Sequence, residues 1–212
     1  VDERSAAFFA LGIAKANRQP VLLLATSGTA PANWLPAVIE ASQSGIPLIL
    51  ISADRPPELQ DCGANQTIEQ INLFGCHVRA SHALGAPDPA FDPAYLHRLA
   101  ARACEQATWP HPGPVHINQP FREPLLPLVD VPAGSHPTRI RIYPPSQAPA
   151  AGAIKELSAA ISGRPGLIVC GQLDNNPEFA SAVTQLADKL SCPILAEPLS
   201  NLRYGKHSQA QI

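Results

Sequence analysis

Two segments of the chain combine residue types that could bind a charged molecule and move a proton. Asp2 and Glu3 stand at the start, and Ser52–Leu59 is followed after three residues by Gly63–Gln66. Together they supply a carboxylate, an arginine and two side-chain amides. We expect them to form one site if the fold brings both segments to the same edge of a sheet.

Arg55 is the most informative of these residues because Pro56 and Pro57 follow it directly. Two prolines restrict the backbone, so the guanidinium is held on a stiff loop. A fixed arginine suits recognition of a carboxylate through two parallel hydrogen bonds. An ion pair with Asp54 or Glu58 is an equally good interpretation from the sequence alone.

The other polar residues also have two interpretations each. Asn65 and Gln66 follow Gly63 and could bind a substrate or hydrogen-bond within their own loop. Glu3 could be an acid at the mouth of a sheet. It could also be a carboxylate that stabilises the start of a helix by about 0.3–1 kcal/mol, and its position alone favours this second interpretation.

The turn Thr26–Thr29 could present backbone N–H groups to an anion. It lacks the lysine of a phosphate-binding loop and the three glycines of a dinucleotide-binding motif. An ordinary capped turn is therefore the favoured interpretation of Thr26, Ser27 and Gly28 taken alone.

Short apolar runs alternate with segments of helical period along the chain. The run Val21–Ala25 is typical of a strand buried on both faces of a parallel sheet. A helix over Ser5–Asn17 precedes it, with an apolar face made of Ala6, Phe9, Ala10, Ile13 and Ala14. The other predicted strands are Pro47–Ile51, Cys76–Ser81 and Pro114–Asn118, and the other predicted helices are Ala32–Ser44, Ile68–Phe74 and Pro93–Thr108.

This alternation predicts an α/β fold with a doubly wound parallel sheet and right-handed crossovers. Ligands bind outside the carboxyl ends of the strands in such sheets. Thr26–Thr29, Ala53–Gln66 and Gln119–Glu123 all follow predicted strands at that end. We therefore expect these three loops to converge.

The composition changes after residue 126. Eleven of the 24 prolines lie between Pro110 and Pro149, and we interpret 127–149 as an extended, semi-stiff linker. Residues 150–212 predict the start of a second, Rossmann-like α/β domain. Its predicted helices are Ala150–Ile161 and Pro177–Leu190, and its predicted strands are Gly166–Cys170 and Pro193–Ala196. The chain has no methionine, and we expect it to be a piece of a longer protein.

Charge and composition argue against several classes of protein. A formal net charge of −2 and a pI near 6.4 give no electrostatic reason to expect nucleic acid or an anionic membrane as a partner. The apolar runs are far shorter than the ~20 residues of a membrane helix, and no secretory leader is recognised. Five widely spaced cysteines favour free thiols and a cytoplasmic protein.

Motifs for catalysis without a cofactor are missing from the sequence. The seven histidines contain no pair at i+3 or i+4, and no His/Cys/Asp cluster has metal-ligand spacing. His116 is interpreted as a core residue with satisfied hydrogen bonds. No Gly-x-Ser-x-Gly turn supports a hydrolase. Chemistry on a bound cofactor remains, with the protein supplying orientation and one proton-handling group.

Several motifs resemble those of one enzyme family. They are Val1–Gly12, Thr26–Ala30, Ala53–Leu59 with Gly63–Gln66, and Val115–Leu125. The family is the MenD family of 2-succinyl-5-enolpyruvyl-6-hydroxy-3-cyclohexene-1-carboxylate (SEPHCHC) synthases, thiamine-diphosphate enzymes of menaquinone and phylloquinone biosynthesis. The resemblance is detailed over residues 1–126 and extends to the remainder only in layout. Its specific part is the combination Ala-Asp-Arg-Pro-Pro-Glu-Leu with Gly-Ala-Asn-Gln.

The resemblance implies how the chain would hold the cofactor. Glu3 would be the catalytic glutamate that hydrogen-bonds the aminopyrimidine ring of thiamine diphosphate. Thr26, Ser27 and Gly28 would line the same ring. A carboxyl group buried against a ring has its protonation set by desolvation, which makes this role physically reasonable for Glu3.

The resemblance also implies the substrates and the reaction. Arg55, Asn65 and Gln66 would face the polycarboxylate substrates, 2-oxoglutarate and isochorismate. The reaction would remove CO2 from 2-oxoglutarate and transfer the remaining succinyl group to isochorismate.

Other parts of such an enzyme are expected outside this chain. Residues 1–126 would be a pyrimidine-binding domain without its first strand and helix, which would leave an unpaired sheet edge. The diphosphate and Mg²⁺ would be held by a carboxyl-terminal domain. The active site would form between two subunits of a homodimer or homotetramer, so the fragment alone is not expected to be active.

Two alternatives remain open. Another thiamine-diphosphate enzyme, such as an acetohydroxyacid synthase or a 2-oxoacid decarboxylase, would also carry a glutamate before a helix, although the loop around Arg55 does not suit it. A non-catalytic Rossmann-like binding module would use its acid and arginine structurally. In that case Glu3→Gln would have only a modest effect on stability.

Overall fold

The computed structural model describes residues 2–88, 92–126, 140–145, 147–173 and 177–212. The chain divides into two compact units, Val1–Pro145 and Ser146–Ile212. Most of the predicted linker 127–149 lies outside the described residues, and 140–145 is an extended segment of the first unit. In the part of the chain that is described, no helix is long and apolar enough to cross a membrane.

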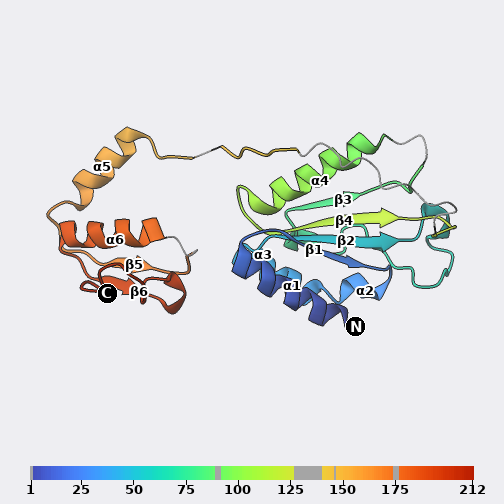
Figure 1. Cartoon of the computed structure of the whole chain (residues 1–212), viewed down its shortest axis with the longest axis horizontal. Coiled ribbons are helices and arrows are strands. Elements are labelled where there is room, and N and C mark those ends of the chain that lie inside the picture. Colours follow the sequence, from blue (N-terminus) through green and yellow to red (C-terminus); the bar gives the residue numbers. More distant parts are fainter. Residues whose placement is uncertain (1, 89–91, 127–139, 146, 174–176) are drawn as a thin grey trace. The chain divides into compact units, whose positions relative to one another are not determined.

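The first unit is built on a sheet of parallel strands in the order β1-β2-β4-β3 (Figure 1). The strands are β1 (Val21–Ala25), β2 (Leu48–Asp54), β3 (Ala80–Ala83) and β4 (Pro114–Pro120). The register places Ser52 of β2 opposite Ala25 on one side and Asn118 on the other. All four strands therefore end at the same edge of the sheet.

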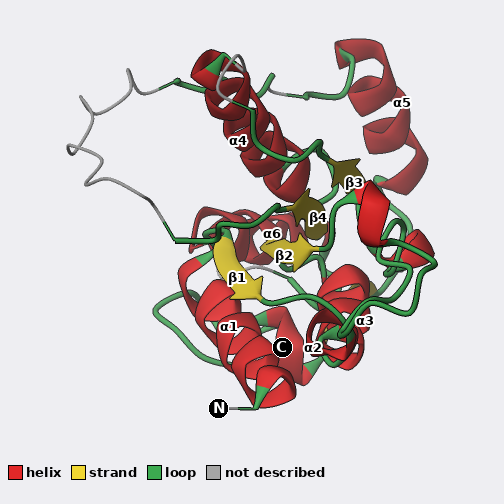
Figure 2. Cartoon of the chain, turned by 90° about the vertical axis from the view of Figure 1, so that its right-hand side faces the viewer, coloured by secondary structure: helices red, strands yellow, loops and turns green. Residues whose placement is uncertain are grey.

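Helices cover both faces of this sheet, as Figure 2 shows. On one face α1 (Glu3–Asn17) and α3 (Leu35–Ser44) pack with β1 and β2 around Trp34 and Phe74. On the other face α4 (Pro93–Thr108) buries Leu99, Ala103 and Ala107 against β2 and β4. The predicted doubly wound α/β fold is confirmed.

The apolar face predicted for the first helix was only partly right. Ala7, Ala10, Leu11 and Ala14 are buried, whereas Phe9 is 73% exposed. Small residues lie against the sheet because they let the helix approach it closely. Ile13, also predicted on that face, is exposed.

The prediction that Val21–Ala25 is buried on both faces is wrong for this chain. Leu23 is buried on the α1 side, but Leu22 and Leu24 are 62% and 75% exposed on the other face. β1 also stands at the end of the strand order, so one of its edges has no neighbouring strand within the described residues.

The helix predicted over Ala32–Ser44 is α3, which begins later, at Leu35, and a separate short helix, α2 (Thr29–Ala32), precedes it. Pro36 in the first turn of α3 has no N–H to donate to the carbonyl of Ala32, which breaks the hydrogen-bond ladder. The turn predicted at Thr26–Thr29 does lead into α2.

Two further predictions differ from the structure. Ile68–Phe74 is not a helix but a series of turns, with Asn72 at φ 60°, followed by the short 3-10 helix η2 (Gly75–His77). The strand predicted at Cys76–Ser81 is β3, which begins later, at Ala80. A backbone with positive φ cannot continue a helix, and local apolar spacing does not reveal it.

The second unit has a smaller parallel pair of strands, β5 (Ile168–Cys170) and β6 (Ile194–Ala196). Its helices are α5 (Ala151–Ile161) and α6 (Pro177–Leu190). Cys170, Val183, Ala187 and Leu202 belong to its core. All four elements were predicted, with bounds that differ by at most two residues.

Candidate functional site

The three loops that were expected to converge do so at the carboxyl ends of the strands. The Gln66 side-chain amide donates to Thr26 Oγ1 at 3.1 Å and to the Ser27 carbonyl at 2.9 Å. On the other side, the Phe121 N–H donates to the Asp54 carbonyl at 3.1 Å. Hydrogen bonds thus join the loops that follow β1, β2 and β4.

The turn at Thr26–Gly28 needs a glycine at its last position. Gly28 has φ 78°, and a Cβ placed there would lie 2.7 Å from Cγ of Gln66. The Gly28 N–H points inward and donates to Oε1 of Gln70 at 2.7 Å. Ser27 is buried and donates to the Gln66 carbonyl, whereas Thr26 is exposed. Thr26 therefore keeps its hydroxyl at the surface of the turn.

Glu3 lies at the same edge of the sheet. Only three residues separate α1 from β1, so the helix runs back along the strand and begins at the strand's carboxyl end, where Figure 1 places the N-terminus. Asp2 caps the helix by accepting from the Ser5 N–H at 2.7 Å, and this hydrogen bond lowers the pKa of Asp2.

The Glu3 carboxylate is half-buried and accepts no hydrogen bond from the residues that the structure describes. Because Asp2 already caps the helix, the capping interaction does not need Glu3. The carboxylate of Glu3 is thus available as an acceptor or acid toward a ligand at this edge.

Arg55 lies at a cavity of about 320 Å³ between the β2 and β4 ends and the loop 57–71. Its Nε donates to the Asn65 carbonyl at 3.3 Å. Among the described residues its guanidinium forms no salt bridge with Asp54 or Glu58, because Glu58 pairs with Arg122 (Nη2–Oε2 2.9 Å). The structural ion pair considered for Arg55 is therefore not formed, and the guanidinium can bind an anion.

Asn65 and Gln66 behave differently from each other. The side-chain amide of Gln66 donates both of its hydrogen bonds to the Thr26–Ser27 turn, so it links two loops. Asn65 contributes its backbone carbonyl to Arg55 and to the Thr67 hydroxyl. Both side chains are at the surface of the site.

A buried polar network beneath these loops was missed in the sequence. Its members are at most 6% exposed: Ser52, Asp54, Gln70, His116 and Asn118. The signal that could have revealed them is the polar residue that interrupts each apolar strand, Ser52 in β2 and Asn118 in β4. The register makes these two residues direct neighbours.

The direction of the hydrogen bonds in this network is set by its donors. Ser52 has one hydroxyl hydrogen, which it donates to Asn118 Oδ1 at 2.7 Å. His116 Nε2, at 2.8 Å, must then donate to Ser52 Oγ. Burial lowers the pKa of His116 to about 4, although the charge of Asp54 acts in the opposite direction. The ring is therefore neutral at pH 7.

His116 was predicted to be a satisfied core residue, and this is half right. It is fully buried, with Phe74 packed edge-on against it at a centroid distance of 4.8 Å. Its Nδ1, however, is a buried atom without a hydrogen-bond partner among the described residues.

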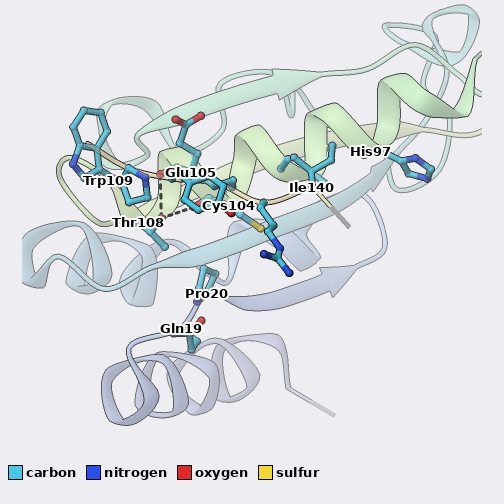
Figure 3. A pocket seen from close by; sticks show the side chains of 14 residues that line it. Gln19, Pro20, His97, Cys104, Glu105, Thr108, Trp109 and Ile140 are labelled. Atoms are coloured by element: carbon cyan, nitrogen blue, oxygen red, sulfur yellow. Dashed lines mark hydrogen bonds between the residues drawn. The ribbon is translucent and has the colours of Figure 1, made fainter. Parts of the chain in front are cut away.

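A second cavity, of about 1020 Å³, lies along α4 (Figure 3). Figure 3 shows His97, Cys104 and Thr108 on the helix, with Gln19, Pro20 and Ile140 also lining the space. Burial raises the pKa of the Cys104 thiol. No residue of the three converging loops lines this cavity, so it is separate from the candidate site.

In the described ranges no group of three His, Cys, Asp or Glu residues could hold a metal ion.

Part of the chain matches a known protein family. Residues 1–73 match the family described as thiamine pyrophosphate enzyme, N-terminal TPP binding domain. This match covers α1, the Thr26–Gly28 turn, β2 and the loop with Arg55 and Gln66. The fold also matches the crystal structure of benzoylformate decarboxylase from Polynucleobacter necessarius, with a TM-score of 0.70 and 24% identity over 94% of this chain and 36% of that chain.

The resemblance to the SEPHCHC synthases is confirmed over the whole chain. The chain is 64% identical over 212 residues to the 2-succinyl-5-enolpyruvyl-6-hydroxy-3-cyclohexene-1-carboxylate synthase of Dechloromonas aromatica (strain RCB). It is 47% identical over 221 aligned residues to that of Geobacillus kaustophilus (strain HTA426). All of this chain is matched in both cases, and it spans 40% and 38% of the length of those relatives.

Proposed function

We propose that the full-length protein that contains this chain is a thiamine-diphosphate-dependent SEPHCHC synthase of the cytoplasm. It would decarboxylate 2-oxoglutarate and transfer the succinyl group to isochorismate, as a homodimer or homotetramer. The observation that carries this proposal is the 64% identity to such a synthase across all 212 residues. The convergence of the loops that bear Thr26, Arg55 and Gln66 supports it.

The residues at the strand ends fit the pyrimidine half of the cofactor. Glu3 offers a carboxylate without a partner in the described chain, and Thr26 offers a surface hydroxyl at the same sheet edge. When bound, thiamine diphosphate supplies the electron sink for decarboxylation of a 2-oxoacid. Glu3 would hold the aminopyrimidine ring through a hydrogen bond to a ring nitrogen, and would keep the proton of this hydrogen bond at that nitrogen. Ser27 and Gly28 would shape the backbone against the ring.

The substrate side of the site would be formed by Arg55, Asn65 and Gln66. The guanidinium of Arg55 forms no salt bridge with the described residues and lies on a loop stiffened by two prolines, which suits a carboxylate of 2-oxoglutarate or isochorismate. Asn65 and Gln66 are exposed next to it and offer side-chain amides. Mg²⁺ and the diphosphate would be bound by parts of the protein outside this chain.

The test uses the full-length protein with thiamine diphosphate, Mg²⁺, 2-oxoglutarate and isochorismate, and follows the loss of isochorismate. We expect Glu3→Gln to lower turnover at least ~100-fold, because a positioned acid contributes 10²–10⁴ to rate. The melting temperature should not change. Asp2→Asn is the matched control, because asparagine also caps helices and turnover should be kept.

Each outcome separates the alternatives. Loss of isochorismate that depends on 2-oxoglutarate and on Glu3 supports the proposal. Cofactor binding with turnover of pyruvate alone would indicate an acetohydroxyacid synthase or a decarboxylase instead. A protein that does not bind thiamine diphosphate, with Glu3→Gln silent, would be a non-catalytic binding module.

A further inference from the structure

Gln70 is a fully buried polar side chain whose amide joins two loops. Its Oε1 accepts from the Gly28 N–H at 2.7 Å. Its Nε2 donates to the Ala53 carbonyl and to Asn118 Oδ1, both at 2.9 Å. The side chain is 0% exposed. One amide therefore links the turn after β1 to the carboxyl ends of β2 and β4.

The orientation of this amide is fixed by its partners. A flipped amide would place NH₂ against the Gly28 N–H and an oxygen against the Ala53 carbonyl. Asn118 is fixed in the same way, because its Oδ1 accepts from Ser52 and Gln70. Each amide can adopt only one orientation, so the network defines one geometry.

The same network continues to the backbone of Arg55. Nδ2 of Asn118 donates to Oδ2 of Asp54 at 2.7 Å, and Oδ1 of Asp54 accepts from the Arg55 N–H at 2.7 Å. An unbroken chain of hydrogen bonds, buried except for the part-buried one at Arg55, therefore runs from Gly28, through Gln70, Asn118 and Asp54, to Arg55. It connects the turn proposed to face the cofactor with the arginine proposed to face the substrate.

The segment that carries Gln70 receives little support from its own backbone. The residues around Gln70 form turns rather than a helix, and Gln66 and Asn72 both have positive φ. A residue needed only to fill this space could be apolar, whereas a buried amide is stable only when its partners are all present. The geometry of the loops thus depends on the polar contacts of Gln70.

We propose that Gln70 is a positioning residue that sets the Ser27–Gly28 turn and the Arg55 loop in register, so that cofactor and substrate are held in one frame. This inference rests on the proposed function. Gln70 itself touches neither ligand and acts through the Gly28 N–H and through Asn118.

The first test replaces the amide by a side chain of similar length without hydrogen bonds, Gln70→Met, in the full-length protein. The Gly28 N–H would lose its buried acceptor, and the turn would relax. We expect the Kd for thiamine diphosphate, titrated calorimetrically with Mg²⁺ present, to rise about tenfold, the factor for one unpaired buried group.

Arg79→Met is the matched control. Arg79 donates five hydrogen bonds, to Ser42, His111 and Pro112, at the opposite end of the sheet. Its loss should lower the melting temperature without changing the Kd for the cofactor. A residue with a merely structural role would follow this pattern, so an equal Kd in Gln70→Met and Arg79→Met would overturn the inference.

A second variant keeps the inference testable if Gln70→Met does not fold. The carboxyl group introduced by Gln70→Glu can accept from Gly28 and donate to Ala53 only while it is protonated. The other titratable groups nearby are Asp54, His116 and the exposed Glu69. Both proteins contain them, so the ratio of the two Kd values reports on the new carboxyl group. The Kd ratio between Gln70→Glu and the unmodified protein should therefore rise as the pH is raised and the carboxyl group ionises.

A ratio that does not rise at any pH at which the protein stays folded would overturn the inference even if the enzyme is active. An unmodified protein that does not bind thiamine diphosphate would overturn the proposed function itself. The two failures are thus distinguishable.

Discussion

The position of the Arg79 side chain depends on a glycine, Gly113, which has no side chain of its own to fill the same space. Its guanidinium donates to the carbonyls of Ser42, His111 and Pro112 and to the Ser42 hydroxyl, and so joins the end of α3 to the start of β4. Gly113 leaves the space that the guanidinium occupies, since a Cβ there would lie 2.6 Å from Cζ of Arg79. The glycine is required for a side-chain contact and not for an unusual φ.

We expect Gly113→Ala to lower the free energy of unfolding by about 1–2 kcal/mol, because the guanidinium must move and lose hydrogen bonds. Gly12→Ala is the control, because Gly12 lies in α1 with no atom within 4 Å of a new Cβ. That change should stabilise the helix by about 0.5–1 kcal/mol. The urea midpoints of the two variants should move in opposite directions, and movement in the same direction would contradict this account.

At the scale of elements, β2 and β4 are joined by side chains as well as by their backbone ladder. Ser52 bonds to both His116 and Asn118 across the strand pair, and Phe74 packs against the imidazole. The pKa of His116 is lowered to about 4 chiefly by burial. In the unfolded chain the same ring titrates near 6.5.

This difference predicts that stability falls in acid. Below about pH 6.5 the unfolded chain binds a proton that the folded protein excludes until about pH 4, so unfolding is favoured as the pH falls. Between pH 7 and pH 5 the contribution of His116 should decrease by about 2 kcal/mol. Urea titrations of the protein and of His116→Gln should show a stability difference that narrows by this amount. A stability difference that stays constant between pH 7 and pH 5 would mean that the His116 ring takes up its proton equally in the folded and the unfolded state.

At the scale of the whole molecule, β1 is an edge strand of the first unit's sheet within the residues that the structure describes. Leu22 and Leu24 are exposed beside that edge, on the face that α4 covers only over β2 and β4. An edge strand with large apolar side chains is a template for pairing with another chain.

We therefore expect the 212-residue chain, expressed by itself, to associate as its concentration rises. Replacing Leu22 and Leu24 together by lysine should reduce this association, because charges on an edge strand oppose pairing. Leu96→Lys is the control, since Leu96 is exposed on α4 and not on the strand. Sedimentation velocity at several concentrations measures the effect. Equal association of both variants would show that β1 is not the contact.

Elements with strong local signals were predicted well. α4 begins at Pro93 and ends at Thr108, as its periodicity indicated, and β1 has the predicted bounds. The meeting of the loops after β1, β2 and β4 followed from parallel topology alone and is confirmed. The catalytic role given to Glu3 and the substrates given to Arg55 came from the resemblance and remain proposals.

What the chain sequence determined by itself is therefore the order of helices and strands, the edge at which polar loops gather, and the family resemblance. These depend on short-range periodicity and on contiguous motifs. Only the tertiary structure decided which face of α1 and β1 is covered, that Ile68–Phe74 forms turns, and that Gln70 meets Gly28 and Asn118. Those contacts join residues 42 and 48 positions apart. They form only when strand register brings their partners together, and no local pattern encodes that register.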